Sequence, residues 1–493
     1  MEKKYPLAYS AVFLLCLSLT FSLNPVNAQP DDFTLKSETH WDTYGVGGTC
    51  IPGGNNMAIA DFDGDDIPEV ATGGFAYTEY NQSAFWAPFK IWNWDGTNLN
   101  LEANLTWTGS ISCICAGDAD GDGKTEILTT GPFRNDSGAF SSLRVWSWDG
   151  HDLTLKASYE GTPVGVVSVG DMDGDGKPEI VTTSTSLSFG DNQNRVAQLS
   201  IFRMVDGGLT KVASVDWDSA NYARVSAVYA YDLNSDGKDE IISAGYANFL
   251  NNSHGQLRVW QFDGDTIDLK SNTEWYTVDG AYSPDVAGNV MGNTLANNVK
   301  AADVDGDGTP EIVTSGFTYN GNQAQGQLRI YNWTSDSLNL EASQEWTNLD
   351  ITQPTSIAIS DVNGDGKQEI SVGGGTSGYG SWAPNAPGKS RAELKVFGYD
   401  GNTITLLQSK DWIFGDAAMA WIVDTSDLNR DGTMDIVTIG CIENGTLCDP
   451  DLRVWNLPST VGSLGYLPLV AAGAGAAAVV AVAAAVLLLR KRR

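Results

Sequence analysis

The chain has 493 residues, more than one compact domain usually contains, and 42% of them are hydrophobic. This apolar content can fill a large core and excludes a mostly disordered chain. The 61 acidic residues against 29 basic ones give a formal net charge of −32, which would repel phosphate backbones, so no nucleic-acid partner is expected. The three histidines are far apart in the sequence, which argues against an imidazole-based zinc or general-base site.

The N-terminus has the pattern of a secretory signal. Lys3 and Lys4 precede an apolar stretch at residues 11–23, and the small residue Ala28 follows shortly after it. A basic start, a short apolar stretch and a small residue at the cleavage site are typical of signal peptides. We therefore expect residues 1–28 to be a signal peptide and the following residues to be exported.

The C-terminus has the pattern of a membrane anchor. Residues 467–489 carry no charge, and as a helix they would span about 34 Å, enough for a hydrocarbon core of ~30 Å. Four basic residues follow at 490–493, and such residues mark the cytoplasmic side. We expect a linker and transmembrane helix at 461–489, a basic cytoplasmic tail, and a single-pass cell-membrane protein with its bulk outside. A buried core helix and replacement of this tail by another anchor are the alternatives.

Between these ends, one acidic nonapeptide occurs seven times, about every 60 residues. Its pattern is D-x-[DN]-x-D-x-x-x-[DE], as in DMDGDGKPE at 171–179. A β-prone segment precedes each copy, and an apolar segment such as EIVTTS follows it. Alternating segments such as LRVWSWDG and LTLKASYE come next, and Asp-Gly turns between them are typical of antiparallel hairpins.

Four strands in each repeat predict the blades of a β-propeller, which avoids exposed sheet edges by closing a ring. The expected fold class is therefore all-β, a seven-bladed β-propeller over residues 29–460, plus one C-terminal transmembrane helix. The segment 33–41 reads as a fourth strand without a third, and 452–455 as a third strand without a fourth. We expect the N-terminal strand to close the ring against the C-terminal one. The first strand of each blade, rich in small residues, should line the axis.

The nonapeptide has the composition of a calcium loop. Ca²⁺ takes six to eight oxygen ligands, and oxygens at positions 1, 3, 5 and 9 with the carbonyl of position 7 can supply them. An EF-hand would need a Glu at position 12 between helices, which this pattern lacks. We expect up to seven Ca²⁺ ions as cofactors. The predicted metal ligands are Asp61, Asp63, Asp65, Ile67 and Glu69; Asp118, Asp120, Asp122, Lys124 and Glu126; Asp171, Asp173, Asp175, Lys177 and Glu179; Asp232, Asn234, Asp236, Lys238 and Glu240; Asp303, Asp305, Asp307, Thr309 and Glu311; Asp361, Asn363, Asp365, Lys367 and Glu369; and Asp427, Asn429, Asp431, Thr433 and Asp435.

The alternative is a set of acidic surface turns that bind nothing. It applies most to the fourth and seventh copies, where Asn replaces Asp at position 3 and Ser235 or Arg430 replaces Gly at position 4. The first copy has Asp66 in place of the position-6 Gly, and Asp tolerates the left-handed backbone that this position requires.

The loops, their strands and the closure resemble the FG-GAP repeats of the integrin α-subunit propeller and its prokaryotic relatives, over about residues 32–458. The resemblance implies calcium in the loops joining the first two strands of a blade, on the face opposite the ligand site. The Gly-Ala-Pro part of the FG-GAP motif cannot be identified in the sequence, and its Phe-Gly part has only approximate counterparts at Gly74-Phe75 and Gly316-Phe317. Integrin partners are therefore not carried over.

The loops after the second and fourth strands carry aromatic residues that can stack on sugars or anchor a protein. The candidate ligand-binding residues are Tyr77, Tyr80, Trp86, Phe133, Tyr246, Phe249, Tyr319 and Trp382. Packing of these side chains against neighbouring loops is the alternative. Motifs for a serine hydrolase, a zinc protease or a phosphate loop are absent from the sequence, so no catalytic residues are predicted.

The expected function is a cell-surface, calcium-stabilised module for adhesion or recognition of a glycan or protein. A calcium-dependent extracellular polysaccharide-processing enzyme and a structural subunit of the cell envelope remain alternatives. Export is consistent with a disulfide between Cys441 and Cys448, and Cys50, Cys113 and Cys115 could form one further pair. Asn-x-Ser/Thr triplets offer glycosylation sites at Asn81, Asn104, Asn135, Asn251, Asn332 and Asn444.

Overall fold

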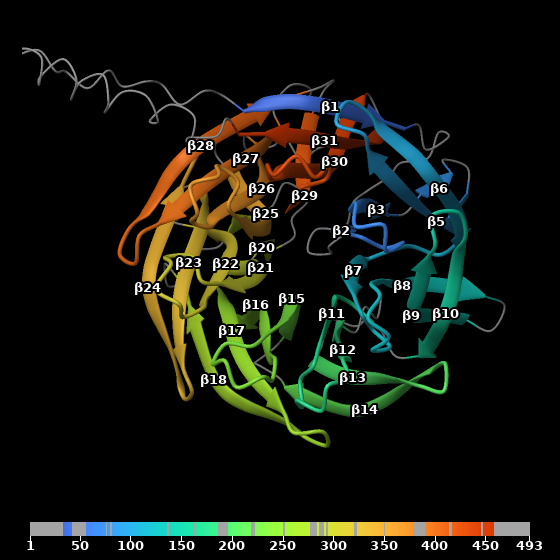
Figure 1. The fold of residues 1–493 in the computed structure, drawn as a ribbon. Helices are drawn as coiled ribbons and strands as arrows, with labels where there is room; N and C mark the ends of the chain where they lie inside the picture. The colour runs from blue at the N-terminus through green and yellow to red at the C-terminus, as the bar shows by residue number, and fades with distance from the viewer. Residues whose placement is uncertain are drawn as a thin grey trace, which may run out of the picture. The chain divides into compact units, whose positions relative to one another are not determined.

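The strands of the protein follow one another around a central axis (Figure 1). The computed structural model describes residues 33–41, 56–74, 76–78, 81–135, 138–161, 164–185, 196–217, 222–249, 252–276, 283–284, 290–291, 294–319, 323–349, 351–377, 390–413, 417–444 and 447–457. They belong to one unit that begins at Phe33. The predicted signal peptide, transmembrane helix and basic tail lie outside these residues.

The first part of the ring consists of four separate sheets of consecutive strands. In each of them the strands pair antiparallel, as the alternating segments predict. A five-stranded sheet contains β2 (Met57–Ala60), β3 (Glu69–Gly73), β4 (Ala76–Thr78), β5 (Asn81–Trp94) and β6 (Leu99–Thr108). Three four-stranded sheets contain β7 (Cys113–Gly117), β8 (Glu126–Asn135), β9 (Gly138–Trp148) and β10 (Leu153–Gly161); β11 (Val167–Gly170), β12 (Glu179–Thr185), β13 (Ala197–Val205) and β14 (Gly208–Trp217); and β15 (Tyr222–Tyr231), β16 (Glu240–Phe249), β17 (Asn252–Phe262) and β18 (Ile267–Trp275).

The last part of the ring is one twelve-stranded sheet. It contains β21 (Thr294–Ala302), β22 (Glu311–Tyr319), β23 (Ala324–Thr334), β24 (Ser337–Trp346), β25 (Ile351–Ser360), β26 (Glu369–Ser377), β27 (Ser390–Tyr399), β28 (Ile404–Trp412), β29 (Ala417–Ser426), β30 (Asp435–Asn444), β31 (Leu447–Asn456) and β1 (Thr34–His40). A short pair, β19 (Ser283–Pro284) with β20 (Val290–Met291), lies between β18 and β21 in the chain.

The prediction of seven separate blades is wrong: the described strands form five blade sheets, and three of the seven acidic loops lie in the twelve-stranded sheet. The reason is hydrogen bonding between successive repeats. β25 and β29 each begin early enough to make one parallel pair with the preceding repeat, at Ala324 with Ile351 and at Ser390 with Ala417. The first strands of the four separate sheets make no such pair among the described residues, although β15 has 10 residues like β25 and β29.

The predicted transmembrane helix at 461–489 lies outside the described residues. Nowhere in the described residues is there an apolar helix of membrane-spanning length. The predicted all-β propeller architecture is correct, whereas the predicted number of blades is not.

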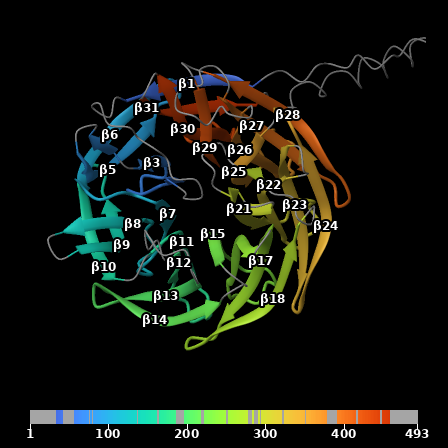
Figure 2. The same ribbon diagram turned by 180° about the vertical axis from the view of Figure 1, so that it is seen from behind.

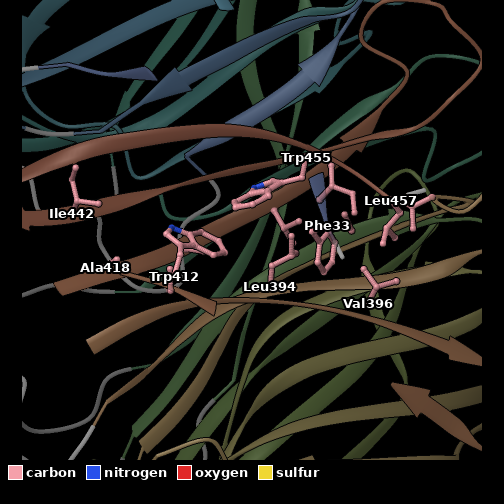
Figure 3. Close-up of a cluster of buried hydrophobic side chains, with 14 residues drawn as sticks. Phe33, Leu394, Val396, Trp412, Ala418, Ile442, Trp455 and Leu457 are labelled. Carbon is pink, nitrogen blue, oxygen red and sulfur yellow. The ribbon is translucent and has the colours of Figure 1, made fainter. Parts of the chain in front are cut away.

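The predicted closure of the ring by the N-terminal strand is confirmed. β1 pairs antiparallel with β31, with Thr34 opposite Asn456 and His40 opposite Asp451 (Figures 1 and 2). Phe33, Trp412 and Trp455 meet beneath this pairing in a buried cluster with Leu394 and Val396 (Figure 3). Closure thus joins side chains from both ends of the ring in one core.

An aromatic pair links each repeat to the next. An aromatic ring at the end of a fourth strand contacts the ring of the Trp, Tyr or Phe on the following third strand, as in Trp412 with Trp455 at 4.9 Å between centroids. The other pairs are Trp41–Trp92, Trp107–Trp146, Tyr159–Phe202, Trp217–Trp260, Trp275–Tyr331 and Trp346–Phe397. Several Trp indoles donate a hydrogen bond to the second strand, as Trp455 Nε1 does to Thr438 Oγ1 at 2.9 Å. The Trp residues that take part in these pairs on the third strands are therefore core.

A glycine on the second strand allows the first strand to bulge toward it. A Cβ atom at Gly316 would lie 1.9 Å from the carbonyl oxygen of Leu295, and one at Gly440 would lie 1.7 Å from that of Met419. Register shifts occur at these points of β21 and β29. Only glycine fits such a close approach, which explains the Gly in segments such as EIVTSGF.

Candidate functional site: the acidic loops

Each acidic nonapeptide connects the first and second strands of a repeat, as predicted. In the third copy, β11 ends at Gly170 and β12 begins at Glu179, so the residue at position 9 already belongs to the second strand. This strand fixes the Glu179 carboxylate beneath the loop, where the side chain is fully buried. The other acidic side chains extend from the loop itself.

Backbone amides of the loop hold its carboxylates in place. In the third loop, Asp171 accepts hydrogen bonds from the N–H groups of Gly174 (2.8 Å) and Gly176 (2.9 Å), and Asp175 accepts one from Lys177 at 2.8 Å. Glu179 accepts one from the N–H of Met172 at 3.0 Å. Three of these bonds recur in all seven loops. The backbone N–H of position 6 donates to the side chain of position 1, the N–H of position 7 donates to that of position 5, and the N–H of position 2 donates to that of position 9.

The loop backbone needs left-handed residues at positions 4 and 6. Gly174 and Gly176 have φ angles of 75° and 82°. Asp66 in the first loop, Ser235 in the fourth and Arg430 in the seventh adopt the same conformation with φ of 71°, 58° and 57°. The sequence departures therefore leave the loop geometry intact.

Four of the seven loops bring three carboxylates together, with one oxygen of each within 4.8 Å of the others. These groups are Asp61, Asp63 and Glu69; Asp118, Asp120 and Asp122; Asp171, Asp173 and Glu179; and Asp303, Asp305 and Glu311. All of these donors are hard oxygens, which suit Ca²⁺ or Mg²⁺ rather than a soft metal. Several acidic clusters of the protein can thus hold a metal ion.

The remaining three loops have Asn at position 3, and its amide nitrogen faces another acid. Asn234 Nδ2 lies 3.0 Å from Glu240 Oε1, Asn363 Nδ2 lies 2.6 Å from Glu369 Oε1, and Asn429 Nδ2 lies 3.2 Å from Asp431 Oδ2. An amide can serve a cation only through its oxygen. These side chains would therefore have to rotate to act as the predicted ligands.

Two loops already contain a cationic side chain. Lys156, on β10, contacts Asp120 and lies 2.9 Å from Glu126 and 3.5 Å from Asp122 in the second loop. Arg203, on β13, contacts Asp173 and donates from Nε to Glu179 at 2.8 Å in the third loop. Both compensate the negative charge of their loop.

The first and fifth loops have an additional acid instead. Glu102 on β6 and Glu341 on β24 stand near the acidic loops, and burial raises the pKa of both, with further increases from Asp63 and Asp305 respectively. Glu102, Lys156 and Glu341 all follow the Leu-x-Leu of a fourth strand. The sequence analysis did not identify this position as part of the loop site, although the sequence shows Lys in one repeat and Glu in others there.

The raised pKa values of the acids at position 9 show that burying negative charge near other carboxylates is unfavourable. Burial, together with neighbouring carboxylates, raises the pKa of Glu69 to about 8, of Glu311 and Glu369 to about 7, and of Asp435 to about 6. Burial also raises the pKa of Glu126, while Lys156 opposes that shift. A cation in the loop would remove this penalty.

These shifts predict a pH dependence for the metal-free protein. An acid whose pKa is raised by folding stabilises the folded state only while it is protonated, so stability should fall as pH rises from about 5 to 8.5. The melting temperature after exhaustive dialysis against metal-free buffer should drop by several degrees over this window. Saturating Ca²⁺ should flatten the profile because the cation replaces the proton. A metal-free melting temperature that stays constant or rises would contradict this assignment.

The predicted ligand-binding aromatics are not brought together by the described residues. Trp86 on β5 is 42% exposed, and Tyr246 on β16 is partly buried. Tyr319 is 9% exposed and packs with Phe317 and Ala324, as the packing alternative expects. Tyr77, Phe133 and Phe249 lie on strands, but their side chains are outside the described part, as are Tyr80 and Trp382 entirely.

The predicted disulfide between Cys441 and Cys448 is not formed, because Cys441 is a free thiol. The reason is strand register: Cys441 lies opposite Pro450, and Cys448 lies opposite Glu443. The Sγ of Cys441 instead accepts a hydrogen bond from Trp421 Nε1 at 3.5 Å. Cys50 is outside the described residues.

Comparison with known families gives one match. Residues 303–372, which include the fifth and sixth acidic loops, match the model of the FG-GAP-like repeat. No curated protein matches the chain. The matched segment, together with the propeller arrangement of the strands, supports an FG-GAP β-propeller, a fold that suggests an extracellular recognition or adhesion module.

Proposed function

We propose that the protein is an extracellular recognition module for a glycan or protein, with Ca²⁺ bound in its acidic loops. The recurrence of one hydrogen-bonded loop with convergent carboxylates is the observation that carries this proposal. The FG-GAP-like match supports it independently of the loop geometry.

Calcium is the cation that these loops suit best. The donors are carboxylates, amide oxygens and backbone carbonyls, and Ca²⁺ accepts six to eight such ligands in flexible geometry, whereas Mg²⁺ demands a tighter octahedron. The bound ion would supply positive charge between the carboxylates. The residues at positions 1, 3, 5 and 9, with the position-7 carbonyl, would hold it. Up to seven ions are proposed, with the fullest acid sets in the first and fifth loops.

The ligand would be bound on the face opposite the acidic loops. In an antiparallel four-stranded repeat, the turns after strands one and three lie at one end, and those after strands two and four lie at the other. The exposed Trp86 is on β5, close to that second end. We propose that calcium fixes the first two strands of each repeat and so positions the connections after strands two and four for ligand binding. In this proposal the protein binds its ligand and does not catalyse a reaction.

A binding experiment tests this function. The full-length protein in detergent is applied to glycan arrays and extracellular-matrix proteins, with and without Ca²⁺. Retention that disappears on chelation and leaves the ligand intact is expected. Release of reducing ends or unsaturated sugars would show a polysaccharide-processing enzyme instead, and ordered self-assembly without ligand would show a structural subunit.

The cation contacts predict that the second loop binds Ca²⁺ weakly. Lys156→Met should tighten binding at this loop roughly three- to tenfold, on the order of 1 kcal/mol, because a partly exposed competing charge is removed. Calcium titration calorimetry should then detect one additional tight site. Lys410→Met removes the same charge from β28, outside the acidic loops, and should change little. Equal behaviour of the two variants would contradict the competition.

A further inference from the structure

The axis of the propeller contains a cavity of about 360 Å³, within the size range of small-molecule sites. Its walls are residues in or beside the first strands of the repeats, β2, β7, β11, β15, β21, β25 and β29, which Figure 1 shows around the centre. The position of these strands was predicted. The small residues expected at the axis are, however, only part of the lining.

One level of the cavity is rich in reactive and charged groups. The residue three places before the first Asp of the acidic loop lines the cavity in several neighbouring strands, where it is Cys115, Ser168, Tyr229, Lys300 or Asp424. In β2 and β25 the same position is Ala58 or Ala358. A thiol, two hydroxyls, an ammonium and a carboxylate are thus gathered at one height of the axis.

The two charged groups at this level have no ion pair with each other. Lys300 Nζ lies 4.5 Å from the ring centroid of Tyr229, and Asp424 accepts a hydrogen bond from the adjacent Thr425 N–H at 2.9 Å. The charges of Lys300 and Asp424 act on each other through space, but within the described residues no hydrogen bond joins them. Charges removed from water are costly unless each has a partner.

The cavity also contains a polar atom with no partner. The Oδ1 atom of Asn298, on β21, is buried and lacks a hydrogen bond within the described part of the protein, and Asn298 lines the cavity beside Lys300. Burial would lower the pKa of Lys300, but Tyr229 and Asp424 outweigh it, so the pKa is raised and the ammonium is charged at neutral pH. Burial raises the pKa of Asp424, while the ammonium of Lys300 and the N–H of Thr425 oppose that shift. The site therefore presents an ammonium, a carboxyl group and an amide oxygen to any occupant.

We propose that this axial cavity binds a small zwitterion, with a carboxylate against Lys300 and an ammonium against Asp424. A simple anion would be repelled by Asp424, and a simple cation would be repelled by Lys300, whereas a zwitterion is attracted by both. A volume of about 360 Å³ admits a molecule of the size of an amino acid. This site is separate from the calcium loops and does not depend on their occupancy.

Calorimetry on the calcium-loaded full-length protein tests the proposal. The probes are glycine, β-alanine, 4-aminobutyrate and 6-aminohexanoate, which carry the two charges at increasing separation. Their N-acetyl and methyl ester forms each lack one charge. We expect one-to-one binding of at least one zwitterion, with each of its single-charge derivatives at least tenfold weaker. Absence of binding by all four zwitterions, or equal binding of a singly charged derivative, would overturn the proposal.

Substitutions of the two charged residues test whether the zwitterion binds in the cavity. Lys300→Met and Asp424→Asn should each weaken binding of the best zwitterion at least tenfold, whereas Lys300→Arg keeps the charge and should retain most of it. Lys270→Met and Asp268→Asn alter a Lys/Asp pair on the outer strand β18, 3.8 Å apart, and serve as matched controls without effect. Circular dichroism establishes that each variant is folded. Unchanged binding in folded Lys300→Met and Asp424→Asn would overturn the proposal.

Discussion

Removal of calcium is expected to lower the melting temperature of the protein by roughly 10 to 20 °C. A site that is saturated at a hundred times its dissociation constant contributes about 2.7 kcal/mol to folding, and several such sites act together. Because the entropy of unfolding grows with chain length, each kilocalorie per mole shifts the melting temperature of a protein of this size by only about 1 °C. The raised pKa of Glu69, Glu311 and Glu369 shows the electrostatic cost that an ion would relieve.

Differential scanning calorimetry with excess chelator, and then with calcium restored, measures this effect. Restored calcium should recover the original transition, and magnesium at the same concentration should recover less of it. Asp303→Asn combined with Glu311→Gln removes two acids of one loop and should reproduce a fraction of the loss. An unchanged melting temperature in excess chelator would exclude metal from the stability of the fold.

The second large effect is expected at the closure of the ring. Trp455→Ala should destabilise the protein by roughly 3–5 kcal/mol, because a large aromatic side chain is lost from a buried site. Trp455 is 2% exposed, and its ring contacts Trp412 at 4.9 Å and Phe33 at 6.4 Å between centroids (Figure 3). Its indole N–H donates a hydrogen bond to Thr438 Oγ1. The variant therefore weakens the packing between the two ends of the ring.

Chemical denaturation in calcium measures the free energy of unfolding of this variant. Trp86→Ala is the matched control, because Trp86 is 42% exposed and should cost less than about 1 kcal/mol. Hydrogen exchange should show faster opening of β1 and β31 in Trp455→Ala than in the control. A loss as small as that of the control would show that closure at this cluster contributes little.

The acidic loops and the closing strand could be predicted because their signals are local. The residues of a loop such as 171–179 are near one another in the sequence, and its hydrogen bonds need only the loop and the first residue of the next strand. The strand at 34–40 was recognised from the missing fourth strand at the C-terminus, and its pairing with β31 follows from that count.

Other features depend on contacts that a repeat pattern does not contain. The number of separate sheets changed because single parallel pairs, such as Ser390 with Ala417, join successive repeats. The predicted disulfide is not formed because the strand register places Cys441 opposite Pro450. The cations in the second and third loops were missed because Lys156 lies 30 residues from Glu126, and Arg203 lies 24 residues from Glu179.

The charged groups that line the axial cavity also depend on contacts between distant parts of the sequence. The sequence predicts that first strands line the axis, but the significance of Lys300 and Asp424 appears only when the ring brings their strands to one cavity. Position-by-position comparison of the repeats would have detected both, since Ala occupies the equivalent position at residues 58 and 358. Charged residues at a position that is uncharged in the other repeats are therefore a useful signal in repeat proteins.

The presence of calcium in the loops is tested most directly by diffraction from crystals grown in millimolar calcium. Anomalous difference maps should contain peaks between Asp61, Asp63 and Glu69 and between Asp303, Asp305 and Glu311, with weaker peaks where Lys156 and Arg203 enter their loops. Maps without a peak at any of the seven loops, in crystals that contain calcium, would contradict the assignment of these loops as cation sites.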